Sequence, residues 1–101
     1  MIIYNVTSKV THAIADKWLQ WVQGVHIPEM TGTGCFTHAI ILHLLEADDS
    51  DGITYAVQYH SESRELYNKY IITFSDDMRK KTMEKWGEQV ISFRSVMQVV
   101  H

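Results

Sequence analysis

The sequence predicts one α+β domain of the ferredoxin-like type, with the order strand, helix, strand, strand, helix, strand over residues 1–101. Four segments show the two-residue alternation of half-buried strands, and two segments carry apolar residues at the three- and four-residue spacing of helices. A length of 101 residues suits one hydrophobic core and leaves no room for a second domain. The simplest arrangement is a four-stranded antiparallel sheet with both helices on one face.

The first half of the chain is expected to contain a strand, a helix and a flexible connection. Residues 2–10 alternate between apolar and polar side chains, which predicts a half-buried strand. From Thr11 onward the apolar side chains recur at helical spacing, which predicts an amphipathic helix. Gly24 and Pro28 are expected to end this helix, and residues 30–34 to form a flexible link to the next strand.

A β-hairpin is expected in the middle of the chain. Residues 35–45 and 53–60 are the predicted strands, and the acidic loop between them ends in the turn-forming pair Asp51-Gly52. Because a hairpin pairs its strands antiparallel and the other connections are helical, strands one and three are expected in the centre of the sheet. Strands two and four are expected at its edges.

The second helix and the last strand complete the pattern. Ser61 or Ser63 is expected to cap the helix, because serine side chains accept hydrogen bonds from free backbone N–H groups. The β-branched stretch at residues 71–74 predicts a break, and Gly87 is expected to stop the helix. Residues 90–100 then alternate as the last strand.

The alternation also predicts which side chains face the helices. One parity of strands one, three and four is assigned to the core, namely Tyr4, Val6, Tyr55, Val57, Tyr59, Ile91 and Phe93. The other parity is assigned to the open face of the sheet, namely Asn5, Thr7, Thr54, Ala56, Gln58, Ser92 and Arg94. This division places one arginine among amides and hydroxyls on the uncovered side.

The second strand is apolar on both sides, which predicts a partner. Ile40 and Leu42 share one side, while Ala39 and Ile41 share the other. An exposed apolar edge strand favours association, so two sheets packing face to face as a homodimer, with a space between them, is the expected arrangement. The alternative is a monomer in which residues 30–34 fold over that edge.

A polar group of residues is the candidate ligand site. Asn5, Gln58 and Arg94, with His60 close by, are expected to meet on the open face. Because a guanidinium fits a carboxylate or phosphate, Arg94 is expected to hold a small anion that the amides orient. The alternative is that Arg94 pairs with an acidic group across the dimer interface.

Histidines add further candidates for ligand binding. His38 and His60 become neighbours across the hairpin in some registers, but they lack a third ligand, so we expect no metal site. His26 either acts as a general base oriented by Glu29 or caps a helix end with its ring. No cofactor motif or catalytic signature is visible, so the expectation is no cofactor and no assignable catalytic residue.

Composition excludes other classes of partner. The net charge is −3, with nine basic and twelve acidic residues, which argues against nucleic acids and anionic membranes. The third strand begins at an acidic Asp51-Gly52 and lacks the basic signature of RNA-recognition domains. No leader peptide and no membrane-spanning stretch are recognised, so we expect a cytoplasmic protein. The single cysteine, Cys35, is expected to be a buried structural thiol.

Several short motifs together resemble a family of short uncharacterised bacterial proteins classed as a domain of unknown function. These motifs are Met1-Ile2-Ile3-Tyr4-Asn5-Val6-Thr7, Trp18-Leu19-Gln20-Trp21, His26-Ile27-Pro28, Thr33-Gly34-Cys35-Phe36, Tyr55-Ala56-Val57-Gln58-Tyr59, Ser63-Arg64-Glu65 and Phe93-Arg94. At the level of fold, the chain is similar to dimeric α+β barrel proteins, which include antibiotic-biosynthesis-type monooxygenases and stress-responsive proteins. The resemblance implies a full-length match and a dimeric barrel, but no activity.

Two functions remain after these exclusions. The first is a small non-catalytic dimeric domain that binds a small anionic ligand on the open sheet face. The alternative is a small dimeric α+β barrel enzyme of the cofactor-free monooxygenase or isomerase type, using His26, His38 or Arg94. The residues by themselves leave open whether the protein is an enzyme.

Overall fold

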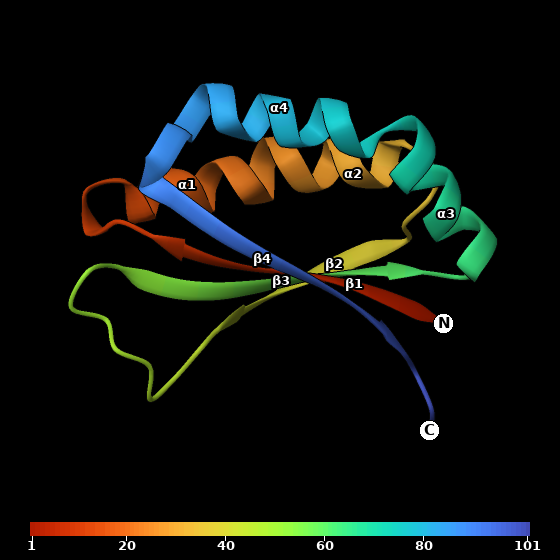
Figure 1. Cartoon of the computed structure of the whole chain (residues 1–101), viewed down its shortest axis with the longest axis horizontal. Helices are drawn as coiled ribbons and strands as arrows, with labels where there is room; N and C mark the ends of the chain where they lie inside the picture. Colours follow the sequence, from red (N-terminus) through yellow and green to blue (C-terminus); the bar gives the residue numbers. More distant parts are fainter.

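The computed structural model describes all residues 1–101 and has the predicted layer of helices on one face of a four-stranded sheet (Figure 1). The strands are β1 (Ile2–Val10), β2 (His38–His43), β3 (Ile53–Ser61) and β4 (Val90–Gln98), in the spatial order β2-β3-β1-β4. All neighbouring pairs are antiparallel. The prediction of central strands one and three, with two and four at the edges, is confirmed.

The helical layer consists of two lengths of helix that lie side by side over the sheet (Figure 1). The first is built from η1 (His12–Ile14), α1 (Ala15–Trp21), the π-helical segment η2 (Val22–His26) and α2 (Ile27–Gly32). The second is built from α3 (Arg64–Thr73), α4 (Ser75–Trp86) and the short η3 (Gly87–Gln89). No helix of the chain is both long enough and apolar enough to cross a membrane.

The prediction that the first helix stops at Gly24 and Pro28 was wrong. The chain stays helical through η2 and α2, and Pro28 lies in the first turn of α2. A proline is tolerated there because the widened turn before it does not need the N–H that proline lacks. Residues 30–32 are therefore helical rather than a flexible link, and Met30 is buried.

The boundaries of the second helical length follow the sequence signals. Ser63 is the cap, since its Oγ accepts a hydrogen bond from the backbone N–H of Leu66 at 3.2 Å. The break falls at Phe74, between α3 and α4. Gly87 ends α4 with a φ of +58°, a conformation that glycine adopts without steric cost. These three predictions are confirmed.

The register between β1 and β4 reverses the predicted faces of the last strand. Arg94 pairs with Val6 and Ser92 pairs with Ser8, so both side chains face the helices. Phe93 pairs with Thr7, so its ring lies on the opposite face. Residues paired across two neighbouring strands lie on the same face of the sheet. Since apolar residues occur at both odd and even positions of β4, alternation alone assigned this strand to the wrong face. The helix-facing core position predicted for Ile91 was wrong for the same reason.

The open face is the side of the sheet away from the helices. In register across the four strands it carries Ile3, Asn5, Thr7, Lys9, His38, Ile40, Leu42, Thr54, Ala56, Gln58, His60, Ile91, Phe93, Ser95 and Met97. The set contains no carboxylate. The predicted second strand over residues 35–45 is shorter at both ends in the structure, since β2 covers only His38–His43. Cys35 and Phe36 lie ahead of it and are buried in the core.

Aromatic rings fill the core between the two layers. Tyr4, on the central strand β1, lies 6.0 Å from Phe36 and 5.6 Å from Tyr70 between ring centroids. Phe36 and Tyr70 meet edge-on at 4.9 Å, and Trp18 stacks on Tyr55 at 5.4 Å. Such pairs add about 0.5–1.5 kcal/mol each beyond the burial of their surface. The size of these rings therefore sets the distance between the helices and the sheet.

Gly52 provides a test of the hairpin's position against β1. A Cβ atom added at this buried glycine would lie 2.4 Å from the carbonyl oxygen of Val10. We expect Gly52→Ala to lower the free energy of unfolding by about 1–3 kcal/mol in urea denaturation. Gly24→Ala is the matched control, because nothing lies within 4 Å of its added methyl group. An equal effect of both substitutions would contradict the close approach.

Candidate functional site

A cavity lies between the sheet and the helices. Its volume is about 40 Å³, room for a few water molecules at about 10–15 Å³ each. The roof comes from α1, η2, α2, α3 and α4, and the floor from β1, β3 and β4. The lining residues are mostly apolar or aromatic: Tyr4, Val6, Ser8, Trp18, Trp21, Val22, His26, Met30, Val57, Tyr59, Tyr70, Met78, Arg79, Thr82, Val90, Ser92 and Arg94.

A wider groove of about 640 Å³ lies outside the cavity, between α4, η3 and β4. Five residues line both hollows, and we call them the rim: Arg79, Thr82, Val90, Ser92 and Arg94. β4 is an edge strand, so no further strand covers this side of the cavity. The groove therefore adjoins the cavity along the rim, on the side of the sheet that ends at β4.

Arg94 reaches this cavity instead of the open face, so its predicted meeting with Asn5 and Gln58 was wrong. Its positive charge lowers the pKa of His26 and opposes the rise in the pKa of Tyr59, both of which line the cavity. The ion pairs of the chain are Lys80–Glu84 and Lys81–Glu29, so Arg94 has no carboxylate partner within the protomer. Its guanidinium is available to a ligand.

Arg79 is a rim residue that the sequence analysis missed. It projects from α4, and contact with the Tyr4 side chain raises the pKa of its guanidinium. It makes no ion pair with a carboxylate. In the sequence it stands beside Lys80 and Lys81, where it looks like part of an exposed basic helix face. No local signal distinguishes it, because only the packing of α4 against the sheet brings it to the cavity.

His26 lines the roof of the cavity. Its ring stacks on Trp21 at 4.7 Å and meets Tyr59 edge-on at 6.4 Å between centroids. Burial lowers the pKa of His26 to about 4, with Lys81 and Arg94 acting in the same direction and Glu29 against it. The ring is therefore uncharged at neutral pH. Its Nδ1 atom is buried and has no hydrogen-bond partner within the protein.

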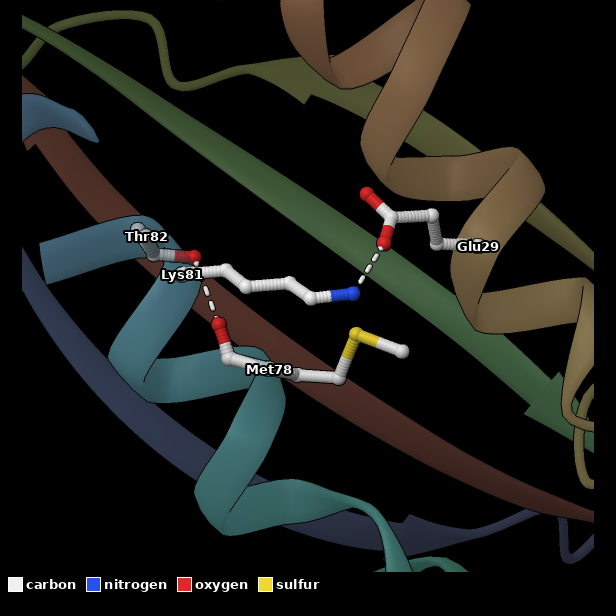
Figure 2. Close-up of polar contacts among 4 residues, drawn as sticks. All are labelled: Glu29, Met78, Lys81 and Thr82. Atoms are coloured by element: carbon white, nitrogen blue, oxygen red, sulfur yellow. Dashed lines mark hydrogen bonds and ion pairs between the residues drawn. The ribbon is translucent and has the colours of Figure 1, made fainter. Parts of the chain in front are cut away.

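Glu29 does not orient His26, contrary to one of the two expectations for that histidine. The Glu29 carboxylate binds the Nζ of Lys81 at 2.6 Å, which joins α2 to α4 (Figure 2). On the same face of α4, the hydroxyl of Thr82 donates to the carbonyl oxygen of Met78 at 3.1 Å. The other expectation, a ring capping the helix end, was also wrong, because His26 lies inside a continuous helix.

Two tyrosine side chains supply hydroxyl groups to the cavity. Burial raises the pKa of Tyr59 and of Tyr70 well above the ordinary tyrosine value. Both phenols therefore stay protonated over the physiological range and can donate hydrogen bonds. On the floor, the hydroxyls of Ser8 and Ser92 lie 2.8 Å apart across β1 and β4. The cavity thus combines apolar walls with several neutral donors.

The remaining predicted site residues lie together on the open face. Asn5 and Gln58 are direct partners across β1 and β3. The Asn5 amide donates to the hydroxyls of Thr7 at 2.9 Å and Ser95 at 3.3 Å, but its Oδ1 atom is buried without a partner. The structure therefore separates this pair from Arg94 and His26, which lie on the helix side of the sheet.

The register of the hairpin brings His38 and His60 into direct pairing. Their rings stack with centroids 4.2 Å apart. Burial and the neighbouring His38 lower the pKa of His60, whose Nε2 atom is buried without a partner. No three histidine, cysteine, aspartate or glutamate side chains converge in a way that could hold a metal ion.

The fold and the interior cavity define the class of protein: a ferredoxin-like α+β domain with a small hollow between its sheet and its helices. The chain belongs to the family DUF4286, a domain of unknown function whose model matches residues 1–100. This confirms the resemblance seen in the sequence motifs. No curated protein matches the chain.

Solved structures with the same fold cover nearly the whole chain. A dimeric ferredoxin-like protein from an uncultured marine organism has a TM-score of 0.74 at 12% identity, covering 99% of this chain and 95% of its own. HapK from Hahella chejuensis has a TM-score of 0.71 at 13% identity, with coverages of 99% and 93%. A protein provisionally named an antibiotic biosynthesis monooxygenase, from Deinococcus radiodurans, has a TM-score of 0.68 at 13% identity, with coverages of 100% and 94%. At these identities the likeness establishes the fold.

The buried His26 predicts a specific pH dependence of stability. Because its pKa is about 4 in the folded protein and 6.5 in a free side chain, the unfolded chain binds the proton more tightly between these values. The stabilisation is complete above pH 6.5 and is lost as the pH falls towards 4. Relative to His26→Phe, the protein is expected to lose about 2–3 kcal/mol of unfolding free energy between pH 7 and pH 4.5. Urea denaturation of the wild type and of His26→Phe at the two pH values measures this difference. Equal losses in the two proteins would contradict a buried, uncharged His26 ring.

Proposed function

We propose that the protein is a homodimeric binding domain that holds a small organic molecule with an acidic group in the groove beside β4, at the opening of the cavity between its sheet and its helices. The observation that carries this proposal is the composition of the cavity. Its walls are aromatic and apolar, while a buried ring nitrogen of His26 has no partner and the Arg94 guanidinium has no carboxylate. Apolar pockets with a few convergent polar groups are typical of small-molecule sites.

The open face supports the dimer. Phe93 is 72% exposed, Ile91 58%, and Ile40 and Leu42 each 44%, and all four lie on the open face. A single protomer thus leaves an apolar sheet surface uncovered, which is unfavourable in water. The dimeric ferredoxin-like neighbour shares this fold. A second copy is a suitable cover, because the face lacks carboxylates and Lys9 is its only lysine or arginine, so two such faces repel little.

This arrangement moves the ligand site from where the sequence analysis expected it. The expected site was on the open face, in a space between two sheets. Here the open face is the proposed dimer surface, and Asn5 and Gln58 are polar groups within it. The ligand site lies within each protomer, on the other side of the sheet.

An enzyme of the cofactor-free type is the second candidate function. One observation favours it: His26 is uncharged at neutral pH and lies beside the cavity with its Nδ1 atom unpaired. A neutral imidazole in that position is able to accept a hydrogen bond from a bound molecule and to orient it. One of the structural neighbours is provisionally named a monooxygenase. The binding proposal needs no such step, so turnover of a bound molecule separates the two functions.

Small aromatic probes test the cavity. Trp18 and Trp21 line it, so their indole signals in NMR spectra report on occupation. We expect benzoate, benzamide or phenol to shift these signals with a dissociation constant of about 1 mM or below. Ser92→Phe, which narrows the rim, is expected to weaken binding at least tenfold. Ser50→Phe, in the exposed loop between β2 and β3 and outside both hollows, is the control.

The same spectra decide between the outcomes. Absence of any shift at the Trp18 and Trp21 signals with all three probes would contradict the binding function. A probe whose own spectrum changes over hours in the presence of the protein, but not with His26→Phe, would favour the enzyme.

A substitution on the open face tests the dimer. Phe93→Lys places a charge where neither this face nor the same face of a second copy offers a carboxylate. We expect the mass measured by light scattering to change from that of two chains to that of one. Ile72→Lys is the matched control, because Ile72 is 84% exposed on α3 and lies away from the sheet face. A wild-type protein of single-chain mass at millimolar concentration would overturn the dimer.

A further inference from the structure

A pair of stacked histidines lies on the open face, which is the surface proposed for the dimer. His38, on the edge strand β2, is the direct partner of His60 on β3. Their ring centroids are 4.2 Å apart and the ring planes are 17° from parallel. The hydroxyl of Thr37 lies 2.8 Å from Nδ1 of His38 and restrains that ring in its stacked position.

The stack suits two neutral rings and is unfavourable for charged ones. Two imidazolium charges at this distance repel each other. A protonated histidine also donates from both of its ring nitrogens. The Nε2 atom of His60 is buried and has no hydrogen-bond partner, so protonation of this ring leaves a buried N–H group without an acceptor.

No carboxylate on the open face balances a charge on this pair. The neighbours of His60 in register on β1 and β4 are Ile3 and Met97, which do not titrate. Glu62 and the amino group of Met1 lie just beyond the strand ends, and neither makes an ion pair with the histidines. Burial and the neighbouring His38 lower the pKa of His60, and no carboxylate acts against them.

A second copy of the open face brings no acid to the pair either. It presents the same residues, so it adds another pair of histidines and another Lys9 but no carboxylate. This holds for any relative orientation of the two copies. In the separate chain His38 is exposed, so water solvates a charge on the pair. Covering the face removes that water, and protonation therefore costs more in the dimer than in the single chain.

We infer that protonation of the His38–His60 pair dissociates the dimer, which makes the open face an acid-sensitive interface. This inference rests on the proposed dimer and concerns its regulation. Because the single chain binds the protons more tightly than the dimer does, acid shifts the equilibrium towards single chains. The pKa of His60 lies below the ordinary value of 6.5 in the single chain, so the dimer keeps its full strength at pH 7.5 and weakens below pH 6.5.

Sedimentation equilibrium of the full-length protein at pH 7.5 and pH 5.5, at equal ionic strength, tests this switch. The dissociation constant of the wild-type dimer is expected to rise at least tenfold at pH 5.5. Circular dichroism at both pH values verifies that the chain stays folded.

Two neutral double variants and one control locate the effect. His38→Phe with His60→Phe keeps two stacked rings, and His38→Gln with His60→Gln keeps two polar side chains. Neither pair titrates, so each dissociation constant is expected to change less than twofold between the two pH values. His43→Phe is the matched control, because His43 lies on the same strand but pairs with Tyr55 on the helix side. It is expected to keep the wild-type response.

The outcomes separate the switch from the dimer itself. A wild-type dissociation constant that is equal at both pH values would overturn the switch and leave the dimer in place. A wild-type response in both double variants would overturn the role of the histidine pair. A wild-type protein of single-chain mass at pH 7.5 and millimolar concentration would overturn the dimer and the switch together.

Discussion

The pairing of β4 with β1 is the constraint on which the chemistry of both sheet faces depends. With Val6 opposite Arg94, the guanidinium lies on the helix side and the ring of Phe93 lies on the open face. A slip of one residue would exchange the two and leave a charged group on the apolar surface. Because β4 is an edge strand, only β1 sets this register. One ladder of backbone hydrogen bonds thus decides where the only arginine of the sheet can act.

The continuous first helix is the second structural condition for the cavity. Because the chain stays helical from residue 22 to residue 32, His26 lies edge-on to Tyr59 and Met30 lines the cavity. The π-helical segment widens the turn ahead of the proline, and the chain continues as α2 to bury Met30. This first helical length is joined to α4 by the Lys81–Glu29 ion pair and by the edge-on contact of Trp21 with Trp86 at 5.8 Å. An unusual turn at one proline therefore accounts for the buried, uncharged histidine.

The two faces of the sheet serve different purposes in the function we propose. The helix side encloses a hollow with aromatic walls and a cationic rim, which suits a small acid. The open side exposes large apolar side chains among neutral polar ones and has no carboxylate, which suits a second copy of the same face. The stacked His38 and His60 belong to this open side, and so does the amide pair of Asn5 and Gln58. The proposed ligand site and the proposed dimer surface therefore lie on opposite faces of one sheet. A substitution on one face can alter ligand binding or dimerisation without changing residues of the other face.

The sequence by itself determined the order of the elements, the central strands, the cap at Ser63 and the stop at Gly87, because each depends on signals within a few residues. It also singled out Arg94 as the one arginine within a predicted strand. It did not determine the face on which Arg94 lies, because apolar residues occur at both odd and even positions of β4. Only the tertiary structure decided this, and only it brought Arg79 and His26 to the same cavity. The physical reason is that the face of an edge strand depends on its hydrogen-bonded partner across the sheet, and that partner lies at the other end of the chain.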